Sequence, residues 1–345
     1  MKAHRRTILV LFTLVAVTLG LSVSASTAQA STPSLCQLLH LCPSPTATPT
    51  STTTASAPAP SASSSTVAGS NNLPVLYVHG YIDTTPVGCS GGDTNKGAAP
   101  LAQVLAAEGY TGPVLGVAYY CLDTGSLVIR NAGDGHCDDL SKQSYTSNTP
   151  IERLGCDLAW SIYNTYSANG QYVSVVGHSM GGLITAWALT HVGQNEYPPY
   201  LLVSNAVTVS SPLDGSYQRG SIQYSNVYVT SWCGVYNECT EMINGSKFLT
   251  ALHQGVLPSS VIFTTIGGGS KDTVDTYESS SAIAAQHKVD MNATAPVAYS
   301  HTTYMTDTSL AMDEPQYETD TSGTTYDANG PHSLGRIAVA LTATS

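Results

Sequence analysis

The stretch VSVVGHSMGGLITAWAL, residues 173–189, constrains the fold more than any other part of the chain. Its first half is an apolar, β-branched run typical of a buried strand, and its second half has the composition of a buried helix. Between them, Ser179 stands in a G-x-S-x-G pattern with Gly177 and Gly181. A strand that turns at once into a helix forces the middle residue toward positive φ, and small flanking residues let the two backbones pass closely. The stretch therefore predicts a nucleophile elbow with Ser179 as the nucleophile.

Strand-like and helix-like segments alternate through the rest of the chain from about residue 71. Strands are expected at 74–80, 113–120, 200–210, 260–267 and 295–300, and helices at 98–110, 279–288 and 333–342. A further helix begins at Thr149-Pro150-Ile151-Glu152, which reads as a capping box with proline at the first helical position. Residues 306–331 read as a Gly- and Thr-rich loop before the last helix. This alternation predicts one α/β domain over residues 71–345, with a mostly parallel central sheet and helices on both faces.

The first 70 residues do not belong to that domain. A basic start is followed by an apolar run over residues 8–23 and by Ala28-Gln29-Ala30, which together indicate a signal peptide over residues 1–30. Residues 31–70 hold a short cysteine-containing segment and a Ser-, Thr-, Ala- and Pro-rich linker that cannot bury a core. We therefore expect a secreted, extracellular protein without a stable membrane anchor.

Charge and cysteine content narrow the possible partners. The net charge of −11, with no basic cluster, argues against binding to nucleic acid or to anionic membrane surfaces. Eight cysteines in an exported chain indicate up to four disulfides, and short loops favour the pairs Cys36–Cys42 and Cys233–Cys239. No C-x-x-C pair and no paired histidine spacing is present, so we expect no metal site. No cofactor is expected either.

A serine hydroxyl becomes a useful nucleophile only when a base takes its proton. On a strand-elbow-helix scaffold of this kind the partners follow in the order serine, acid, histidine. His301, which follows the strand expected at 295–300, is the preferred base, and His332 and His287 are the alternatives. The preferred acid is Asp272 in the loop after the strand at 260–267, with Asp275 as its alternative.

The charge that develops on a reacting carbonyl oxygen needs two backbone N–H donors. One is expected from Met180, the residue after the nucleophile. The other is expected from Tyr81, in the loop His79-Gly80-Tyr81 after the first strong strand. These two groups form the predicted oxyanion hole.

Five segments carry a resemblance to a known family: VLYVHGY, VVGHSMGGL, VTVSSPLDGS, GGGSKDTVD and YSHTTYMTD. In this order and spacing the chain resembles secreted bacterial lipases and esterases of the α/β-hydrolase superfamily, most closely the class 2 bacterial lipases. The resemblance covers residues 73 to about 306 and implies Ser179, Asp272 and His301 as the triad. It departs from the family in the long segment before the last helix, which keeps His332 as an alternative base.

The resemblance implies a serine hydrolase that cleaves small-molecule or lipid esters through an acyl-enzyme. We expect the protein to act as a monomer. Residues 214–258 lie where this fold often inserts a cap or lid, and their aromatic side chains either line an acyl pocket or pack inside the cap. The same triad also performs acyl transfer and amide cleavage on this fold, so an acyltransferase or amidase is the alternative. A third, non-catalytic possibility is a surface protein that has lost its activity.

Overall fold

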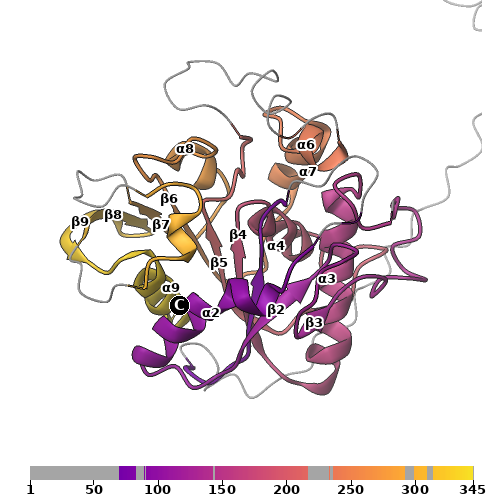
Figure 1. Ribbon diagram of the computed structural model, residues 1–345, viewed down its shortest axis with the longest axis horizontal. Helices are drawn as coiled ribbons and strands as arrows, with labels where there is room; N and C mark the ends of the chain where they lie inside the picture. The colour runs from indigo at the N-terminus through magenta and orange to yellow at the C-terminus, as the bar shows by residue number, and fades with distance from the viewer. Residues whose placement is uncertain are drawn as a thin grey trace, which may run out of the picture. The chain divides into compact units, whose positions relative to one another are not determined.

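The strands that the computed structural model describes form one nine-stranded sheet, in the order β3-β2-β1-β4-β5-β6-β7-β8-β9 (Figure 1). The structure describes residues 70–344 except for 83–88, 90, 143, 217–232, 234–235, 292–298 and 309–313. All of these belong to the unit Ala55–Ser345. The predicted signal peptide, the linker and the Cys36–Cys42 pair lie outside the described residues.

Seven neighbouring strands, β3 to β7, run parallel, and the last two pairings are antiparallel. The central strands are buried on both faces, as is typical of a parallel sheet covered by helices. The predicted mostly parallel sheet is confirmed. The strands are β1 (Val75–Val78), β2 (Val114–Ala118), β3 (Leu127–Val128), β4 (Val173–His178), β5 (Val203–Val209), β6 (Ile262–Gly267), β7 (His287–Asp290), β8 (Glu314–Asp320) and β9 (Gly323–Gly330).

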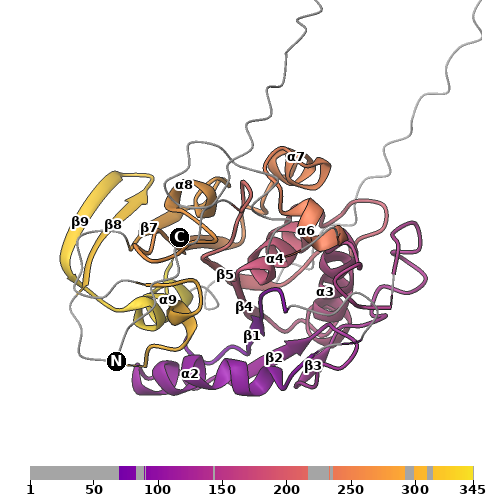
Figure 2. The same cartoon turned by 45° about the horizontal axis from the view of Figure 1, so that its top comes forward.

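Helices cover both faces of the sheet. One apolar cluster joins α2 and α9 to one face, and a second joins α3, α4 and α7 to the other. Figure 2 shows α2 and α9 lying together, apart from α3 and α4. The helices are α2 (Thr94–Ala107), α3 (Ile151–Thr165), α4 (Met180–Thr190), α6 (Asn237–Glu241), α7 (Lys247–Gln254), α8 (Tyr277–Ser280) and α9 (Ser333–Leu341), with 3-10 turns η1 (Ser167–Asn169) and η2 (Thr303–Met305). In the described part of the chain, none of them combines the length and the hydrophobicity that a membrane span requires.

The predicted capping box at the start of α3 is wrong. Pro150 is the N-cap residue and no side chain caps the helix from within. The Thr149 hydroxyl instead accepts from the Thr146 N–H at 3.1 Å. The N–H group of Ile151, which has no partner within the helix, donates to Glu241 Oε2 at 2.7 Å. A carboxyl group from the distant helix α6 therefore takes the place of the local cap.

The predicted helix over residues 279–288 is also wrong. Only the short helix α8 forms, and His287 begins strand β7. The Gln286 side chain accepts from the Phe263 N–H at 2.8 Å and donates to the Val261 carbonyl at 3.0 Å. These bonds fasten the segment to the start of β6, and residues 287–290 then pair with β6. Pairing at the sheet edge therefore overrides the local preference for helix.

The expected Gly- and Thr-rich loop before the last helix contains a β-hairpin instead. Strands β8 and β9 pair antiparallel around Thr321-Ser322, and β8 extends the sheet beyond β7. Asp320 Oδ1 accepts from the backbone N–H of Ser322 at 2.7 Å and stabilises the turn. Most of β9 is exposed on both faces, so it lacks the alternation of apolar and polar residues that marks a half-buried strand.

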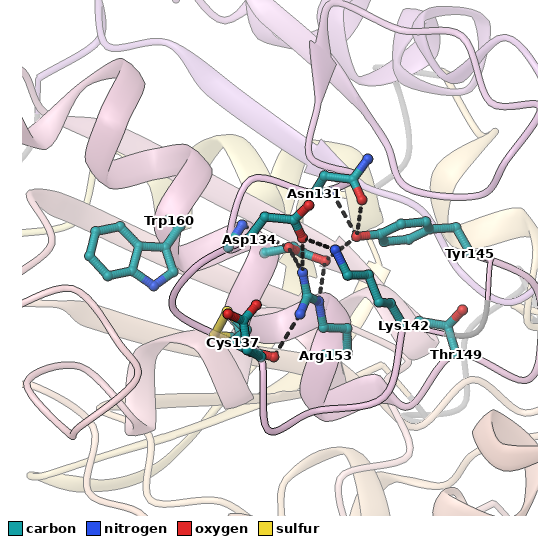
Figure 3. A network of polar contacts seen from close by, with 12 residues as sticks. Asn131, Asp134, Cys137, Lys142, Tyr145, Thr149, Arg153 and Trp160 are labelled. Atoms are coloured by element: carbon teal, nitrogen blue, oxygen red, sulfur yellow. Dashed lines mark hydrogen bonds and ion pairs between the residues drawn. A yellow bond between two sulfur atoms is a disulfide. The ribbon is translucent and has the colours of Figure 1, made fainter.

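The long segment between β3 and α3 shows no regular element in its described residues and is fixed by a buried ion network (Figure 3). The Arg153 guanidinium, with no exposed surface, bonds Asp157 at 3.1 Å, Asp134 at 2.7 Å and the Cys137 carbonyl at 2.6 Å. The Tyr145 hydroxyl donates to Asp157 Oδ2 at 3.0 Å, the same oxygen that accepts from Arg153 Nε. A charge buried in this way is tolerated because every donor has a partner.

Three disulfides join described cysteines: Cys89–Cys121, Cys137–Cys156 and Cys233–Cys239. The predicted Cys233–Cys239 pair is confirmed. Of the cap expected over residues 214–258, the structure describes mainly α6 and α7. Phe248 of α7 is buried and stacks on Trp187 of α4, with ring centroids 4.9 Å apart, so this aromatic packs on the body of the domain. Tyr224, Tyr228 and Trp232 lie outside the described residues.

Candidate active site

Ser179 occupies the sharp turn between β4 and α4. Its backbone has φ 55° and ψ −129°, in the positive-φ range that residues other than glycine rarely adopt. A side chain would clash at both flanking glycines. A Cβ atom at Gly177 would lie 2.5 Å from the Gly181 carbonyl oxygen, and a Cβ atom at Gly181 would lie 2.1 Å from the Val78 carbonyl oxygen. A Cβ at Gly80 would lie 2.7 Å from the Ser179 Cβ. The glycines therefore permit the close approach of strand, helix and β1 loop that presents the Ser179 hydroxyl.

The structure brings Ser179, His301 and Asp272 together at the carboxyl edge of the parallel strands. His301 Nε2 lies 2.7 Å from Ser179 Oγ, and His301 Nδ1 lies 3.2 Å from Asp272 Oδ2. Ser179 follows β4 and Asp272 follows β6. Most of the strand expected before His301, at 295–300, lies outside the described residues. The arrangement can pass a proton from the hydroxyl to the imidazole while a carboxylate holds the other ring nitrogen.

The alternative residues lie elsewhere. His287 Nδ1 contacts Glu318 Oε1 at 3.0 Å on the outer strands. His332 is the N-cap residue of α9, fully buried, and its ring nitrogens have no hydrogen-bond partner among the described residues. Asp275 is buried, and burial together with the charge of Asp272 raises the pKa of Asp275 well above its ordinary value. None of the three is bonded to Ser179 or His301.

Asp272 is an ionised carboxylate in a buried position. Burial alone would raise the pKa of Asp272, but hydrogen bonds from His301, Ser210 and the Val274 N–H outweigh it and lower that pKa. Its Oδ1 accepts from the N–H groups of Val274 at 2.9 Å and Asp275 at 3.0 Å. The carboxylate is therefore fixed as an acceptor for the imidazole.

Sequence reasoning missed Ser210, at the end of β5. Its hydroxyl forms a short hydrogen bond to Asp272 Oδ2 and lies 2.9 Å from His301 Nδ1. It thus donates to the carboxylate and accepts from the ring N–H, bridging the pair. Ser210 has φ 45°, a second positive φ at this edge of the sheet. The stretch VTVSSPLDGS carries part of the family resemblance, but no feature of it singles out this hydroxyl.

His178, next to the nucleophile, was also missed. Its Nε2 donates to the His301 carbonyl oxygen at 2.7 Å. Burial, reinforced by His301, lowers the pKa of His178 to about 3, so the ring stays neutral. A neutral ring that donates to a backbone carbonyl fixes the main chain of His301 without adding charge to the site.

A cavity of about 230 Å³ lies next to Ser179, and of the two residues of the predicted oxyanion hole Tyr81 lines it. Tyr81 and Gly80 line it from the β1 loop, and Gly92, Asp93, Thr94 and Gly97 line it at the start of α2. Met180 is the first residue of α4, where backbone N–H groups lack partners within the helix. Among the described residues, no group of three or more His, Cys, Asp or Glu side chains is placed to hold a metal ion.

Comparison with known proteins finds one family model and several solved structures that are similar to this chain. Residues 142–309 match the family model of the PGAP1-like alpha/beta domain. No curated protein matches the sequence. Among solved structures, lipase B of Aspergillus fumigatus matches with a TM-score of 0.45 and 18% identity over 79% of this chain, which spans 57% of that lipase. The mature lipase BlEst2 of Bacillus licheniformis matches with a TM-score of 0.36 and 19% identity, over 59% of this chain and 67% of that one. The lin2722 product of Listeria innocua matches with a TM-score of 0.38 and 13% identity, over 61% of this chain and 78% of that one. The family match and the strand order confirm the predicted fold class.

Proposed function

We propose that this protein is a secreted α/β-hydrolase of the lipase and esterase type, which cleaves carboxylic esters with Ser179 as its nucleophile. The observation that carries the proposal is the 2.7 Å contact between Ser179 Oγ and His301 Nε2, with Asp272 and Ser210 on the other ring nitrogen. The positive φ at Ser179 supports the same role, because strained backbone at a reactive position is typical of this elbow.

In the first half of the reaction Ser179 Oγ attacks the ester carbonyl carbon and passes its proton to His301 Nε2. Asp272 stabilises the imidazolium that results. The carbonyl oxygen becomes an oxyanion and accepts from the N–H groups of Met180 and Tyr81. The bond to the alcohol then breaks, the alkoxide takes the proton from His301, and an acyl-enzyme remains on Ser179.

In the second half a water molecule gives a proton to His301 Nε2 and attacks the acyl carbon. The second tetrahedral intermediate collapses, the carboxylic acid leaves, and His301 returns the proton to Ser179 Oγ. Apart from the ester and the water molecule, every group in these steps belongs to this chain. Disulfides in the folded domain support the secreted location, because disulfides persist mainly in oxidising compartments.

The test is hydrolysis of p-nitrophenyl esters from acetyl to palmitoyl by the full chain with its disulfides formed. Ser179→Ala should lower kcat by about 10⁴-fold or more. Ser174→Ala is the matched control, because it removes another buried hydroxyl, which lies near the start of β4 whereas Ser179 follows the end of that strand. We expect it to keep the activity of the natural protein.

The chain-length profile identifies the substrate class. Activity that rises toward palmitoyl indicates a lipase, and activity confined to short acyl groups indicates an esterase. Complete absence of ester hydrolysis, in protein whose Ser179 still reacts with a fluorophosphonate probe, would refute the ester assignment and direct attention to amides or acyl transfer.

A further inference from the structure

The imidazole of His79, at the edge of the cavity beside Ser179, is held at both of its nitrogens. Nδ1 lies 2.8 Å from the Gly80 carbonyl oxygen, and Nε2 lies 2.9 Å from Asp123 Oδ2. Both ring nitrogens are therefore engaged by oxygen atoms of the protein, one on the main chain of the β1 loop and one on the Asp123 side chain. Its contacts point to a role in holding the β1 loop.

Asp123 anchors His79 from a buried position. Its Oδ2 also accepts from the N–H groups of Tyr119 at 3.1 Å and Tyr120 at 2.8 Å, and its Oδ1 accepts from the Gly92 N–H at 3.0 Å. Burial alone would raise the pKa of Asp123, but the bonds from His79 and the backbone lower it. Asp123 is therefore a fixed anion that orients the imidazole.

Tyr119 holds the same loop from the other side. Its ring stacks on His79, with centroids 4.1 Å apart and planes 8° from parallel. Its hydroxyl, fully buried, donates to the carbonyl oxygens of His79 at 2.8 Å and Gly80 at 2.9 Å. The Gly80 carbonyl thus accepts from two donors, the Tyr119 hydroxyl and His79 Nδ1.

The peptide group between Gly80 and Tyr81 is trans, so its N–H points away from its carbonyl oxygen. Two donors that fix the Gly80 oxygen therefore also fix the direction of the Tyr81 N–H. The Gly80 Cα packs directly against Ser179, as the 2.7 Å approach of a Cβ there shows. Rotation of this one peptide group would remove the N–H donor without disturbing the triad.

We propose that Tyr119, His79 and Asp123 are positioning residues that hold the Gly80–Tyr81 peptide group in the orientation required for the oxyanion hole. The inference rests on the proposed function and names the residues that set one of its two donors. These residues act through the backbone and do not touch the substrate.

The test compares Tyr119→Phe with the natural protein, because this change removes one oxygen and keeps the stacked ring. Removing an oxyanion-hole donor outright costs about 10²–10³-fold in kcat, so loss of one of its two anchors should cost about tenfold. KM should stay within about twofold, because the donor acts on the transition state. The inhibition constant of a trifluoromethyl ketone, whose serine adduct carries an oxyanion, should rise in parallel with the loss of kcat.

Tyr145→Phe is the matched control, since it removes a buried tyrosine hydroxyl from the ion network of Figure 3. It should lower the melting temperature and leave kcat and the ketone inhibition constant unchanged. Asp123→Asn is the second variant and should reduce kcat at least as much as Tyr119→Phe.

These measurements distinguish a failure of the positioning role from a failure of the proposed ester hydrolysis. If the natural protein hydrolyses esters while Tyr119→Phe or a folded Asp123→Asn keeps full kcat and ketone affinity, the positioning role is refuted and the proposed function stands. A loss of kcat without weaker ketone binding also refutes it. If the natural protein neither hydrolyses esters nor reacts with a fluorophosphonate, both proposals fall together.

Discussion

A pair of carboxyl groups joins helix α6 to the start of α3 and should make the stability of the domain depend on pH. Glu241 Oε2 accepts from the Ile151 N–H at 2.7 Å, and its side chain also hydrogen-bonds Glu152. Burial, together with the neighbouring Glu152 carboxylate, raises the pKa of Glu241 from 4.5 to about 9. Burial raises the pKa of Glu152 as well. The folded pair therefore keeps a proton at neutral pH that the unfolded chain releases.

The direction in which the free energy of unfolding changes with pH follows from proton linkage. Between the unfolded and folded pKa values the folded state binds more protons, so the free energy of unfolding falls as the pH rises. The stabilisation is complete below about pH 4.5 and is lost as the pH rises toward 9. Each pH unit in this window is worth about 1.4 kcal/mol, so the pair should cost the domain up to about 3 kcal/mol between pH 5 and pH 7.

The perturbation is Glu241→Gln, which keeps an acceptor for the Ile151 N–H and gives Glu152 an amide donor in place of a carboxyl group. Urea unfolding curves at pH 5, 6, 7 and 8 should show a flatter dependence in this variant, with the difference from the natural protein growing by about 3 kcal/mol from pH 5 to pH 7. Glu108→Gln, at an exposed glutamate after α2, is the control and should leave the slope unchanged. Parallel curves for Glu241→Gln and the natural protein would refute the reasoning.

Three further predictions concern the site and its support. Asp272→Asn should lower kcat by about 10³–10⁴-fold because the imidazole loses its carboxylate. Asp275→Asn should leave kcat within about threefold, because burial already keeps that carboxyl group neutral. Steady-state kinetics of both variants test this pair of predictions. Ser210→Ala should lower kcat about tenfold with little change in KM, through loss of the hydroxyl that bridges the pair, and an unchanged kcat would contradict that role. Arg153→Met should cost about 3–5 kcal/mol in urea unfolding because it leaves Asp157 as a buried charge without its partner; a loss below about 1 kcal/mol would show that the network contributes little.

The sequence was sufficient to find the residues that meet at the carboxyl edge of the sheet. Strand-to-helix turns after short apolar runs are local patterns, and parallel strands bring their carboxyl ends to one edge. Chain order then favours Ser179, Asp272 and His301, and the distances between these side chains agree with that preference. Chain order alone leaves Asp275, His287 and His332 as alternatives, and His332 stays one because the segment before the last helix is long.

The errors have a common physical origin in contacts between distant segments. The helix expected at 279–288 gave way to pairing with β6, which Gln286 fastens at both its donor and its acceptor. The local cap expected at Thr149 was replaced by Glu241, ninety residues away along the chain. Neither of these contacts can be read from the segment whose structure it changes, because secondary-structure propensity describes that segment alone.

The positioning residues that the sequence did not reveal act on carbonyl oxygens of the main chain. His178 donates to the carbonyl of His301, and Tyr119 and His79 donate to the carbonyl of Gly80. A sequence motif identifies the side chains that carry out chemistry. Every residue has a backbone carbonyl group, so a hydrogen bond to that group requires no particular residue type at the position that accepts it. An intact G-x-S-x-G elbow with its acid and base is therefore not sufficient evidence of full activity in this fold. The rate also depends on whether the donors that orient the peptide groups around the site are present.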